Sequence, residues 1–352
     1  MEHPPEPPRP KRRPRYSGKN PRKFEEKYKE HNPQLYPETV QKVLASGKTP
    51  AGAHRPILVQ EILQILRPQP GEVVIDATLG YGGHSTEILP LLRPGGRLIG
   101  LDIDPLELPK TEVRLRALGF VPEEFTAVHA NYAAFTQVLD SLLLPGANII
   151  LADLGTSSMQ LDNPARGLSF KSEGPLDLRM NPQKGLPAWE FIAHLDQDKI
   201  IELLIENADE PFARLIAPVL VEDRKRNGLR TTSLLANAVR RGLQSLPKSL
   251  QDQEGDASIR RVFQAIRIAV NHEFETLEAF LRIVPQGLLQ GGRVAILTFH
   301  SGEDRRVKRA FQEHSRAGIY REINDDVIRP SPEEIRANPR ASSAKLRWAI
   351  KA

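Results

Sequence analysis

The chain contains no cysteine. This absence excludes disulfide bonds, metal sites built on thiolates and catalysis by a cysteine nucleophile. The chain also lacks any run of about 18 apolar residues, the length a membrane-spanning helix needs, and no secretory leader is visible. We therefore expect a soluble, cytoplasmic protein.

The composition that is present indicates a globular protein with a polyanionic partner. Its 352 residues are 39% apolar, which is enough to bury one large core together with an insertion. The formal net charge of +5 and the isoelectric point near 9.3 favour attraction to a polyanion such as RNA.

Residues 1–50 carry the positive surplus. They contain twelve Lys or Arg and six Asp or Glu, a difference of six that exceeds the net charge of +5 for the whole chain. The first 20 positions are rich in proline and poor in large apolar residues, so they cannot form a core. The pattern predicts a flexible basic arm that attracts phosphates or serves only as a solubilising tail.

The most informative segment runs from Gly71 to Asp104. In order, it has an apolar run at 73–75, Asp76, the glycine-rich residues 80–83, a helical pattern at 84–92, and an apolar run at 98–101 followed by Asp102. This is a βαβ unit whose first turn is rich in glycine. An acidic residue at the end of the second strand can hold ribose hydroxyls.

Turns of this kind occur both in NAD enzymes and in S-adenosylmethionine (SAM) enzymes. A dinucleotide site uses G-x-G-x-x-G, whose amides face a pyrophosphate. Residues 80–84, Gly-Tyr-Gly-Gly-His, lack the third glycine at that offset. Because SAM has no phosphates, the turn favours SAM, and a purely structural glycine turn is the remaining alternative.

The alternation of strands and helices continues along the chain. Helices are predicted over 60–66, 106–118, 132–144 and 303–314, and strands over 125–129, 148–152, 294–299 and 346–350. This order predicts a doubly wound α/β sheet. The groups that follow its strands are Asp76, Asp102, the corner Ala130-Asn131-Tyr132, Asp153 and His300. Since ligands bind such sheets at the carboxyl ends of the strands, we expect these groups to meet at one edge.

Strand patterns are absent between Asp153 and about residue 270. Loops marked by Gly and Pro come first, and helical patterns follow at 198–206, 212–224 and 232–243, with one long helix predicted over 261–284. The region is predicted to be a helical insertion that forms a lid or a substrate platform. The expected division is a basic arm at 1–50, the first part of the core at 51–155, the insertion at 156–270 and the second part of the core at 271–352.

Seven motifs occur in a fixed order. They are Asp76–Ser85 (DATLGYGGHS), Asp102–Pro105 (DIDP), Asp153–Asp162 (DLGTSSMQLD), Arg166–Phe170 (RGLSF), Gly174–Met180 (GPLDLRM), Phe263–Ile268 (FQAIRI) and Phe299–Arg305 (FHSGEDR). With these motifs, residues 54–352 closely resemble MraW, the bacterial family that methylates N4 of a cytosine, position 1402, in the decoding region of 16S rRNA. The resemblance implies a class I SAM-dependent methyltransferase: a Rossmann-like doubly wound sheet with an inserted helical domain.

The same resemblance implies roles for individual residues and a partner. Cofactor-binding roles fall on Gly82, Gly83, His84, Asp102, Tyr132, Asp153 and Gln160. Asp102 is expected to hold the ribose, and Tyr132, where the family often has Phe, to pack by the adenine. The implied partner is 16S rRNA or the small ribosomal subunit, with no metal and no membrane.

Methyl transfer to an exocyclic amine is difficult because the N4 lone pair is delocalised into the ring. A carboxylate that accepts the amine's hydrogen bond favours a tetrahedral nitrogen. Alignment of the nitrogen, the methyl group and the sulfur supplies much of the remaining rate acceleration. Asp153 is the candidate acceptor, with service to SAM alone as the alternative. His300 is the candidate base, with a structural hydrogen bond as the alternative. Methylation at C5 would need a cysteine, so we expect direct transfer without a covalent intermediate.

The loops after Asp153 carry the candidate substrate residues, which are Arg166, Phe170, Asp177 and Arg179. They are predicted either to reach the exposed base or its phosphates, or to stabilise the insertion. Other functions remain open: methylation of another RNA or of a protein, or a non-catalytic RNA-binding or assembly factor. The complete set of groups at the strand ends argues against the last of these, and the glycine spacing argues against an NAD enzyme.

Overall fold

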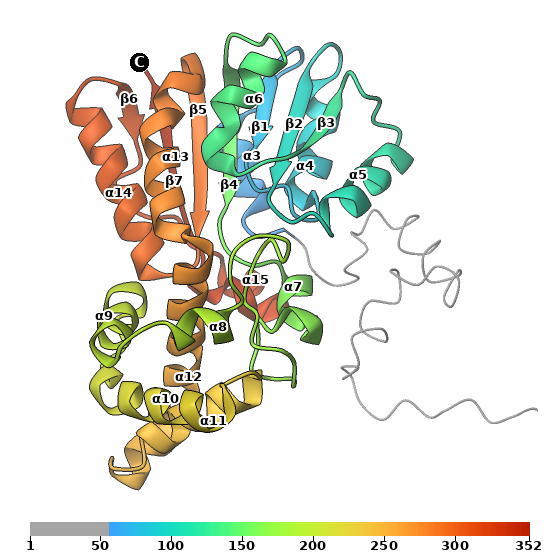
Figure 1. Cartoon of the computed structure of the whole chain (residues 1–352). Coiled ribbons are helices and arrows are strands. Elements are labelled where there is room, and N and C mark those ends of the chain that lie inside the picture. The colour runs from blue at the N-terminus through green and yellow to red at the C-terminus, as the bar shows by residue number, and fades with distance from the viewer. Residues whose placement is uncertain (1–55) are drawn as a thin grey trace, which may run out of the picture. The chain divides into compact units, whose positions relative to one another are not determined.

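The computed structural model describes residues 56–352, except for the side chains of Ser158, Met159 and Asn227. The predicted basic arm lies outside the described residues. The described residues belong to one compact unit, in which helices cover both faces of a sheet and a further group of helices lies at one end of it (Figure 1).

One seven-stranded sheet forms the centre of this unit, in the order β3-β2-β1-β4-β5-β7-β6. Its strands are β1 (Val73–Asp76), β2 (Arg97–Asp102), β3 (Phe125–His129), β4 (Ala147–Asp153), β5 (Leu288–Thr298), β6 (Tyr320–Ile323) and β7 (Lys345–Lys351). Strands β1 to β5 are parallel to one another, whereas β7 runs antiparallel to both β5 and β6.

The strand order reverses direction beside β1. The chain leaves β1 through β2 and β3 on one side and returns to β4 on the other side of β1. In open sheets of this kind, ligands bind where the order reverses, outside the carboxyl ends of the strands. The predicted doubly wound α/β sheet is confirmed, and the reversal identifies the edge beyond β1 and β4 as the place to look for a site.

Helices bury both faces of the sheet because its parallel strands are apolar on both sides. One face is covered by α3 (Val59–Leu66), α4 (Gly83–Ile88), the 3-10 helix η2 (Leu89–Leu92) and α5 (Leu108–Ala117). The other is covered by the 3-10 helix η3 (Tyr132–Ala134), α6 (Phe135–Ser141), α13 (Glu273–Gly287) and α14 (Ser301–Arg316). Successive residues of β1 separate accordingly, with Val74 in the first core and Ile75 in the second.

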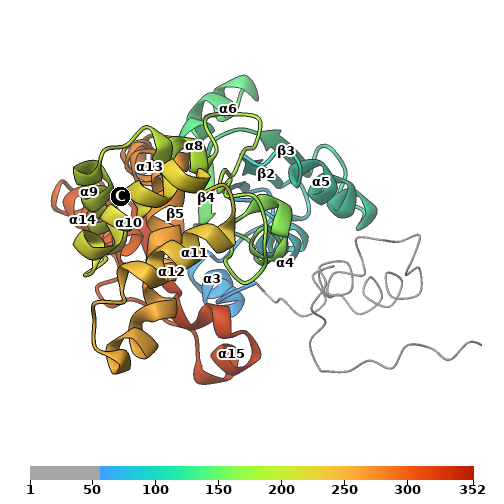
Figure 2. The same ribbon diagram turned by 60° about the horizontal axis from the view of Figure 1, so that its bottom comes forward.

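The chain between β4 and α13 forms a third hydrophobic core of its own. Its elements are α7 (Ser158–Asp162), η4 (Pro164–Arg166), α8 (Ala188–Ala193), α9 (Gln197–Ala208), α10 (Ala213–Asn227), α11 (Thr232–Gly242) and α12 (Lys248–Asn271). Figure 2 shows α10, α11 and α12 lying together. Between β6 and β7 lie the short helices α15 (Pro332–Ala337) and η5 (Pro339–Ser343). No helix of the described chain is both long and apolar enough to span a membrane.

The single helix predicted over 261–284 is wrong. The chain forms α12, which begins earlier at Lys248 and ends at Asn271, and then α13, which begins at Glu273. His272 between them has φ 51° and ψ 43°, a left-handed conformation that interrupts the α-helical hydrogen bonds. Histidine is among the non-glycine residues that adopt this conformation more readily, so neither Gly nor Pro marks the break in the sequence.

His272 provides a test of this break, because its side chain is exposed and acts mainly through the backbone. We expect His272→Gly to leave the free energy of unfolding within about 0.5 kcal/mol, since relief of left-handed strain is offset by a more flexible unfolded chain. His272→Val should lose about 1–2 kcal/mol, because a β-branched residue is strained at positive φ. Urea unfolding measures both, and equal stability of the Val variant and the wild type would contradict the break.

Candidate functional site

The carboxyl ends of the five parallel strands meet at one edge of the sheet, as predicted. Asp76, Asp102 and Asp153 are the last residues of β1, β2 and β4. Asn131 follows β3 and His300 follows β5 by two residues each. The arrowheads of these strands point toward the group of helices formed by the insertion (Figure 1). The edge therefore lies between the sheet and the insertion.

The glycine-rich turn carries the chain from β1 into α4. Gly80 and Gly82 have φ values of 48° and 65°, which favour glycine. Gly83 is required for another reason: a Cβ there would lie 2.6 Å from Cγ of Pro56. The missing side chains of Gly82 and Gly83 therefore let the turn pack closely against α5 and Pro56, with the Gly80 N–H beside Asp102.

Asp102 anchors this turn. One carboxylate oxygen, Oδ2, accepts a hydrogen bond from the Gly80 N–H (2.7 Å), and Oδ1 accepts one from the Asp104 N–H (2.8 Å). Burial raises the pKa of Asp102 to about 6 despite these two bonds. A carboxylate has about four acceptor positions. Asp102 is thus ionised at neutral pH and retains acceptor capacity for hydroxyl groups of a ligand.

Asp76 is buried, and both of its carboxylate oxygens are hydrogen-bonded within the protein. Its Oδ2 accepts from the Ser85 hydroxyl (2.6 Å) and its Oδ1 from the Thr78 N–H (3.3 Å). Its side chain is 2% exposed, and burial raises its pKa. Asp76 therefore fixes the start of α4 against the end of β1 and does not face a ligand.

Of the three aspartates at the strand ends, Asp153 has the fewest donors to its carboxylate. Among the described residues, its carboxylate is approached only by His84, whose Nδ1 lies 3.6 Å from Oδ2. His84 Nε2 lies 3.0 Å from the Ile57 carbonyl oxygen, and since a carbonyl only accepts, Nε2 carries the hydrogen. Burial raises the pKa of Asp153 to about 6, and the nearby His84 opposes the rise. At 31% exposure, this side chain remains accessible from the edge.

Tyr132 lies beside these groups at the end of β3. Its ring meets Phe280 of α13 edge to face, with ring centroids 5.1 Å apart. Burial raises the pKa of the Tyr132 hydroxyl, and the negative charges of Glu273 and Glu303 raise it further. The ring is therefore a fixed, neutral surface at the edge, as packing against a flat ligand requires.

His300 begins α14. Its Nδ1 accepts a hydrogen bond from the Glu303 N–H (3.4 Å), and its Nε2 lies 3.2 Å from Glu303 Oε1 without the alignment of a hydrogen bond. Burial disfavours the charged form of Glu303, but contacts with His300, the Phe299 N–H and Arg267 outweigh it and lower the pKa. In this structure His300 caps the helix, and its role as a base stays a prediction.

Glu273, His300 and Glu303 are spaced as metal ligands are, with one ligand atom of each within 4.8 Å of the others. However, Arg267 donates two hydrogen bonds to Glu273, at 2.8 and 2.9 Å. It also lies 3.3 Å from the Thr156 hydroxyl. The guanidinium already supplies positive charge to this cluster, and we assign no metal to it.

Gln160 and Arg166 both bond to Asp104, which lies two residues after the end of β2. Its Oδ2 accepts from Gln160 Nε2 (2.8 Å) and from Arg166 Nη1 (2.6 Å). Arg166 is 6% exposed and Asp104 is completely buried. In the described structure Arg166 holds protein segments together, and a contact of this side chain with RNA stays a prediction, as does a contact of Gln160 with a cofactor.

The other three predicted substrate residues lie in the insertion. Arg179 donates to both carboxylate oxygens of Asp177 (2.8 and 2.7 Å) and to the Gly185 carbonyl (3.0 Å). Phe170 packs against Phe263, with ring centroids 5.9 Å apart. These contacts stabilise the insertion, and substrate contacts of the three residues stay predictions.

Sequence reasoning missed Asp104, Arg267, Glu273 and Glu303 as parts of the site. Glu303 had a usable signal, since an acidic residue three positions after a helix-capping residue matches a capping box. Asp104 also had a signal, since it is a second aspartate only two positions after Asp102. Arg267 and Glu273 had no such signal, because they meet only when α12 and α13 are separated at His272.

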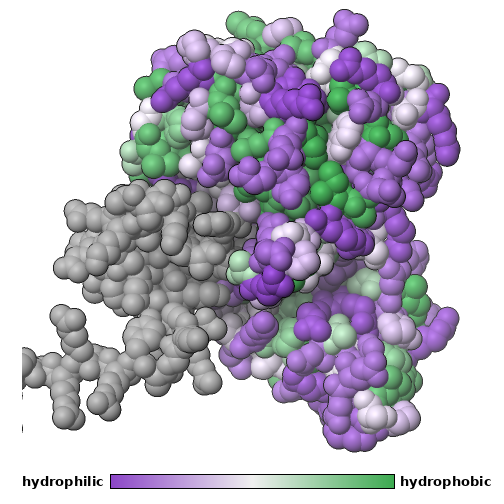
Figure 3. Space-filling view, turned by 180° about the vertical axis from the view of Figure 1, so that it is seen from behind, coloured by the Kyte–Doolittle hydropathy of each residue, from purple (hydrophilic) through white to green (hydrophobic). Residues whose placement is uncertain are grey.

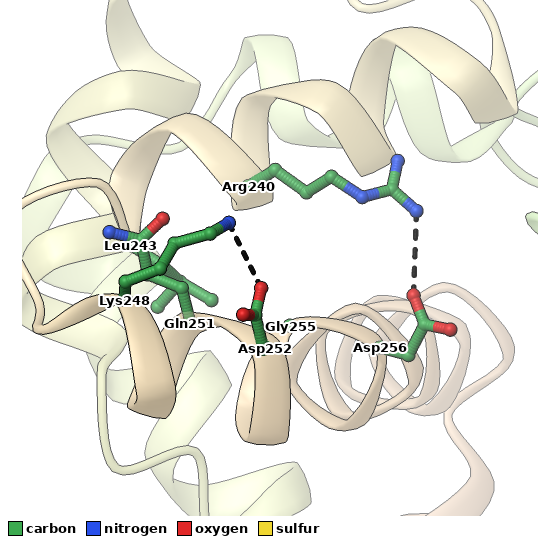
Figure 4. Close-up of a pocket in the computed structure, with 7 residues that line it drawn as sticks. All are labelled: Arg240, Leu243, Lys248, Gln251, Asp252, Gly255 and Asp256. Atoms are coloured by element: carbon green, nitrogen blue, oxygen red, sulfur yellow. Dashed lines mark hydrogen bonds and ion pairs between the residues drawn. The ribbon is translucent and has the colours of Figure 1, made fainter.

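A separate hollow of about 340 Å³ lies between α11 and α12 (Figure 4). Its charged side chains are paired with one another: Lys248 with Asp252 at 2.9 Å, and Arg240 with Asp256 at 3.4 Å. It involves the end of α12 farther from the sheet (Figure 1). The hollow is therefore separate from the groups at the strand ends.

The rear surface carries hydrophobic side chains mainly in its upper half, over the sheet, and mostly hydrophilic ones over the insertion (Figure 3). Exposed large hydrophobic residues of the sheet unit include Leu106, Val113, Leu118 and Val121, near or within α5, and Leu143. Exposed apolar residues are common on soluble domains. The insertion likewise exposes large hydrophobic residues, namely Leu186, Ile205 and Leu215.

The reversal of strand order, the glycine turn, the acidic strand ends and the inserted helices define a class I, Rossmann-like methyltransferase. Within that class, the chain belongs to the MraW methylase family, whose model matches residues 51–352.

Several relatives match over 97% of this chain. Ribosomal RNA small subunit methyltransferase H 1 of Lachnoclostridium phytofermentans is 50% identical over 343 residues, which are 93% of its length. Ribosomal RNA small subunit methyltransferase H 2 of Alkaliphilus metalliredigens is 49% identical over 342 residues, 97% of its length. A solved structure, a putative rRNA-methylase from Clostridium thermocellum, covers 85% of this chain and 99% of its own at 13% identity, but its TM-score of 0.39 is too low to support an argument.

The raised pKa of Asp153 makes a prediction about stability. Its folded pKa of about 6 exceeds the ordinary value of 3.8, so the folded state binds more protons between these values. The buried charge therefore lowers the free energy of unfolding. This loss of stability is absent below about pH 4, grows as the pH rises through 6, and is complete above that pH. Because the side chain is partly exposed, we expect Asp153→Asn to stabilise the protein by only about 1 kcal/mol at about pH 8, with a gain that vanishes near pH 4.

Thermal unfolding of the wild type and of Asp153→Asn across this pH range measures the effect. Asp140→Asn is the matched control, since Asp140 is an exposed aspartate of α6. A loss of stability in Asp153→Asn at about pH 8 would show that the carboxylate is compensated by contacts that the structure does not contain.

Proposed function

We propose that this protein is a SAM-dependent methyltransferase that methylates N4 of a cytosine in the decoding region of 16S rRNA, position 1402. Membership in the MraW methylase family supports methyl transfer. The relatives named as small-subunit rRNA methyltransferases support the substrate class. One structural observation supports the reaction centre: Asp153 is the accessible, weakly compensated carboxylate where the strand order reverses.

The residues at the edge suit SAM. Asp102 keeps acceptor positions for ribose hydroxyls beyond the two that the Gly80 and Asp104 N–H groups use. The turn that contains Gly82 and Gly83 is joined to Asp102 through the Gly80 N–H, and Tyr132 offers a neutral aromatic ring for the adenine. His84 and Gln160 complete the proposed set. When bound, SAM supplies a methyl group on a positively charged sulfur.

Asp153 is the proposed partner of the amine. As an ionised carboxylate at neutral pH, it accepts a hydrogen bond from the N4 amine and so favours the tetrahedral nitrogen that the reaction requires. A partly exposed side chain at the last position of β4 is suited to this contact. Direct transfer needs no nucleophile from the protein, in keeping with a chain that has no cysteine.

The nitrogen gains the methyl group and must lose one proton. Asp153, with a pKa of about 6, can take it, and the free Nδ1 of His84 lies 3.6 Å from the carboxylate as the next acceptor. His300 is less suited, because its Nδ1 already caps α14. We therefore favour Asp153 and His84 for the proton, and retain His300 as the second candidate.

The insertion is the proposed RNA-binding part, with boundaries near residues 156 and 270. Its helices stand opposite the strand ends, and its loops carry Arg166, Phe170, Asp177 and Arg179 (Figure 1). Two of these residues, Asp177 and Arg179, form an ion pair, and their side chains are 21% and 17% exposed. A cytosine must leave its stack to reach Asp153, and a helical platform beside the edge would hold the surrounding RNA.

Transfer of labelled methyl from SAM to purified small ribosomal subunits and to naked 16S rRNA, followed by nucleoside digestion, tests this function. We expect N4-methylcytidine from the wild type and none above background from Asp153→Ala. Asp140→Asn, the exposed aspartate variant, should keep wild-type activity. Label in another nucleoside or in protein would show a different substrate, and measurable SAM binding without transfer would favour a non-catalytic RNA-binding role.

Asp102 makes a prediction about cofactor affinity. Asp102→Ala should weaken SAM binding by about tenfold to a hundredfold, the value of a lost hydrogen bond to a charged group. For the wild type, affinity should fall as the pH drops below about 6, because Asp102 becomes protonated there. Calorimetry measures both, and in Asp102→Asn the pH dependence should be smaller. Affinity unchanged by Asp102→Ala would remove this residue from the site.

A further inference from the structure

Asp104 and Arg166 form a completely internal ion pair that the proposed reaction does not use. The exposed fractions of the two side chains are 0% and 6%, and Arg166 Nη1 lies 2.6 Å from Asp104 Oδ2. The other oxygen of Asp104 accepts from the Leu106 N–H (2.9 Å), and Gln160 adds a third donor. The carboxylate is thus held from three directions.

On one side, this pair adjoins the proposed ribose-binding carboxylate. The Asp104 N–H donates to Oδ1 of Asp102, and Asp102 Oδ2 in turn holds the Gly80 N–H of the glycine turn. A ligand that fixes the Asp102 carboxylate therefore also fixes the backbone of Asp104, two residues away, and with it the position of the Asp104 side chain.

On the other side, the pair holds the insertion. Arg166 Nη2 donates to the carbonyl oxygens of Arg179 (3.1 Å) and Met180 (2.7 Å). The same segment is attached to the end of α12, since the Met180 N–H donates to Asn271 Oδ1 (2.6 Å). Arg166 thereby fixes residues 177–181, which include the proposed RNA contacts Asp177 and Arg179.

Stability alone is a poor explanation for such a pair. Taking two charges out of water costs about as much as their attraction returns, and well-packed apolar residues of similar size are often as stable. The planar guanidinium offers several donors in a fixed fork, so Arg166 bonds Asp104 and two carbonyl groups at once. These bonds fix the position of residues 179 and 180 relative to Asp104.

We propose that Asp104 and Arg166 are positioning residues that couple SAM binding at Asp102 to the placement of segment 177–181, and so to RNA binding. This inference rests on the proposed function, because it takes SAM and RNA as the ligands of the two sides. Occupancy of the cofactor site orders the segment through Asp102, Asp104 and Arg166 in turn. By linkage, RNA on the insertion strengthens SAM binding by the same factor.

Two variants separate position from stability. Asp104→Asn combined with Arg166→Met removes both charges and nearly keeps the side-chain sizes, so we expect the fold to be retained. Arg166→Lys keeps the charge near Asp104, but one ammonium cannot reproduce the planar fork to both carbonyls. The matched control is Glu72→Gln combined with Arg293→Met, a pair at the opposite ends of the strands whose atoms lie 2.7 Å apart.

The measurement is the affinity for small subunits with and without S-adenosylhomocysteine, together with hydrogen exchange of residues 177–181. For the wild type and the control we expect the ligand to tighten subunit binding about tenfold and to slow exchange in this segment. In both Asp104/Arg166 variants, S-adenosylhomocysteine should still bind but should no longer tighten subunit binding or slow hydrogen exchange of residues 177–181. Their kcat/KM for subunits should be lower than that of the wild type.

A full tenfold coupling in either Asp104/Arg166 variant would overturn the inference, as would an equal loss in the Glu72/Arg293 control. If the wild type methylates small subunits but shows no coupling, the inference fails and the proposed function stands. If the wild type transfers no methyl to small subunits or 16S rRNA, the proposed function fails and takes the inference with it.

Discussion

Charged carboxylates at the buried edge of a sheet must find hydrogen-bond donors, and the structure around the strand ends satisfies that need. Asp76 takes the Ser85 hydroxyl, Asp102 takes two backbone N–H groups, and Asp104 takes Arg166 and Gln160. The Asp153 carboxylate has no hydrogen-bond donor among the described residues, and Nδ1 of His84 lies 3.6 Å from its Oδ2. Burial raises the pKa of both Asp102 and Asp153 to about 6, and of these two carboxylates Asp153 is the one whose oxygens are not held by N–H groups of the protein.

The insertion is held at this edge mainly by polar contacts. Its first loops attach to the sheet through Asp104, and its last helix attaches through Arg267, which meets Glu273 and the Thr156 hydroxyl. The left-handed turn at His272 lets α12 belong to the insertion while α13 packs on the sheet. A polar attachment fixes distance and direction more sharply than an apolar one, as a site shared by two structural parts requires.

Much of the fold could be predicted from the sequence. The parallel strands are short apolar runs bounded by turn residues, and the strand predicted at 125–129 coincides with β3. The short edge strand β6 could not be found, because Arg321 and Glu322 are exposed and leave no apolar run. The helix break at His272 was also hidden, since the apolar spacing continues through it and the residue itself is compatible with a helix.

The sequence by itself determined the order of the five parallel strands, the glycine turn and the acidic residue that ends each of β1, β2 and β4, because these features follow from local periodicity and backbone sterics. Only the tertiary structure decided which of these groups are satisfied internally. Arg166 and Asp104 are 62 residues apart in sequence, and Arg267 and Thr156 are 111 apart. Contacts over such distances depend on how the whole chain packs, and they convert a set of polar residues into a structural pair, a helix cap or an accessible carboxylate.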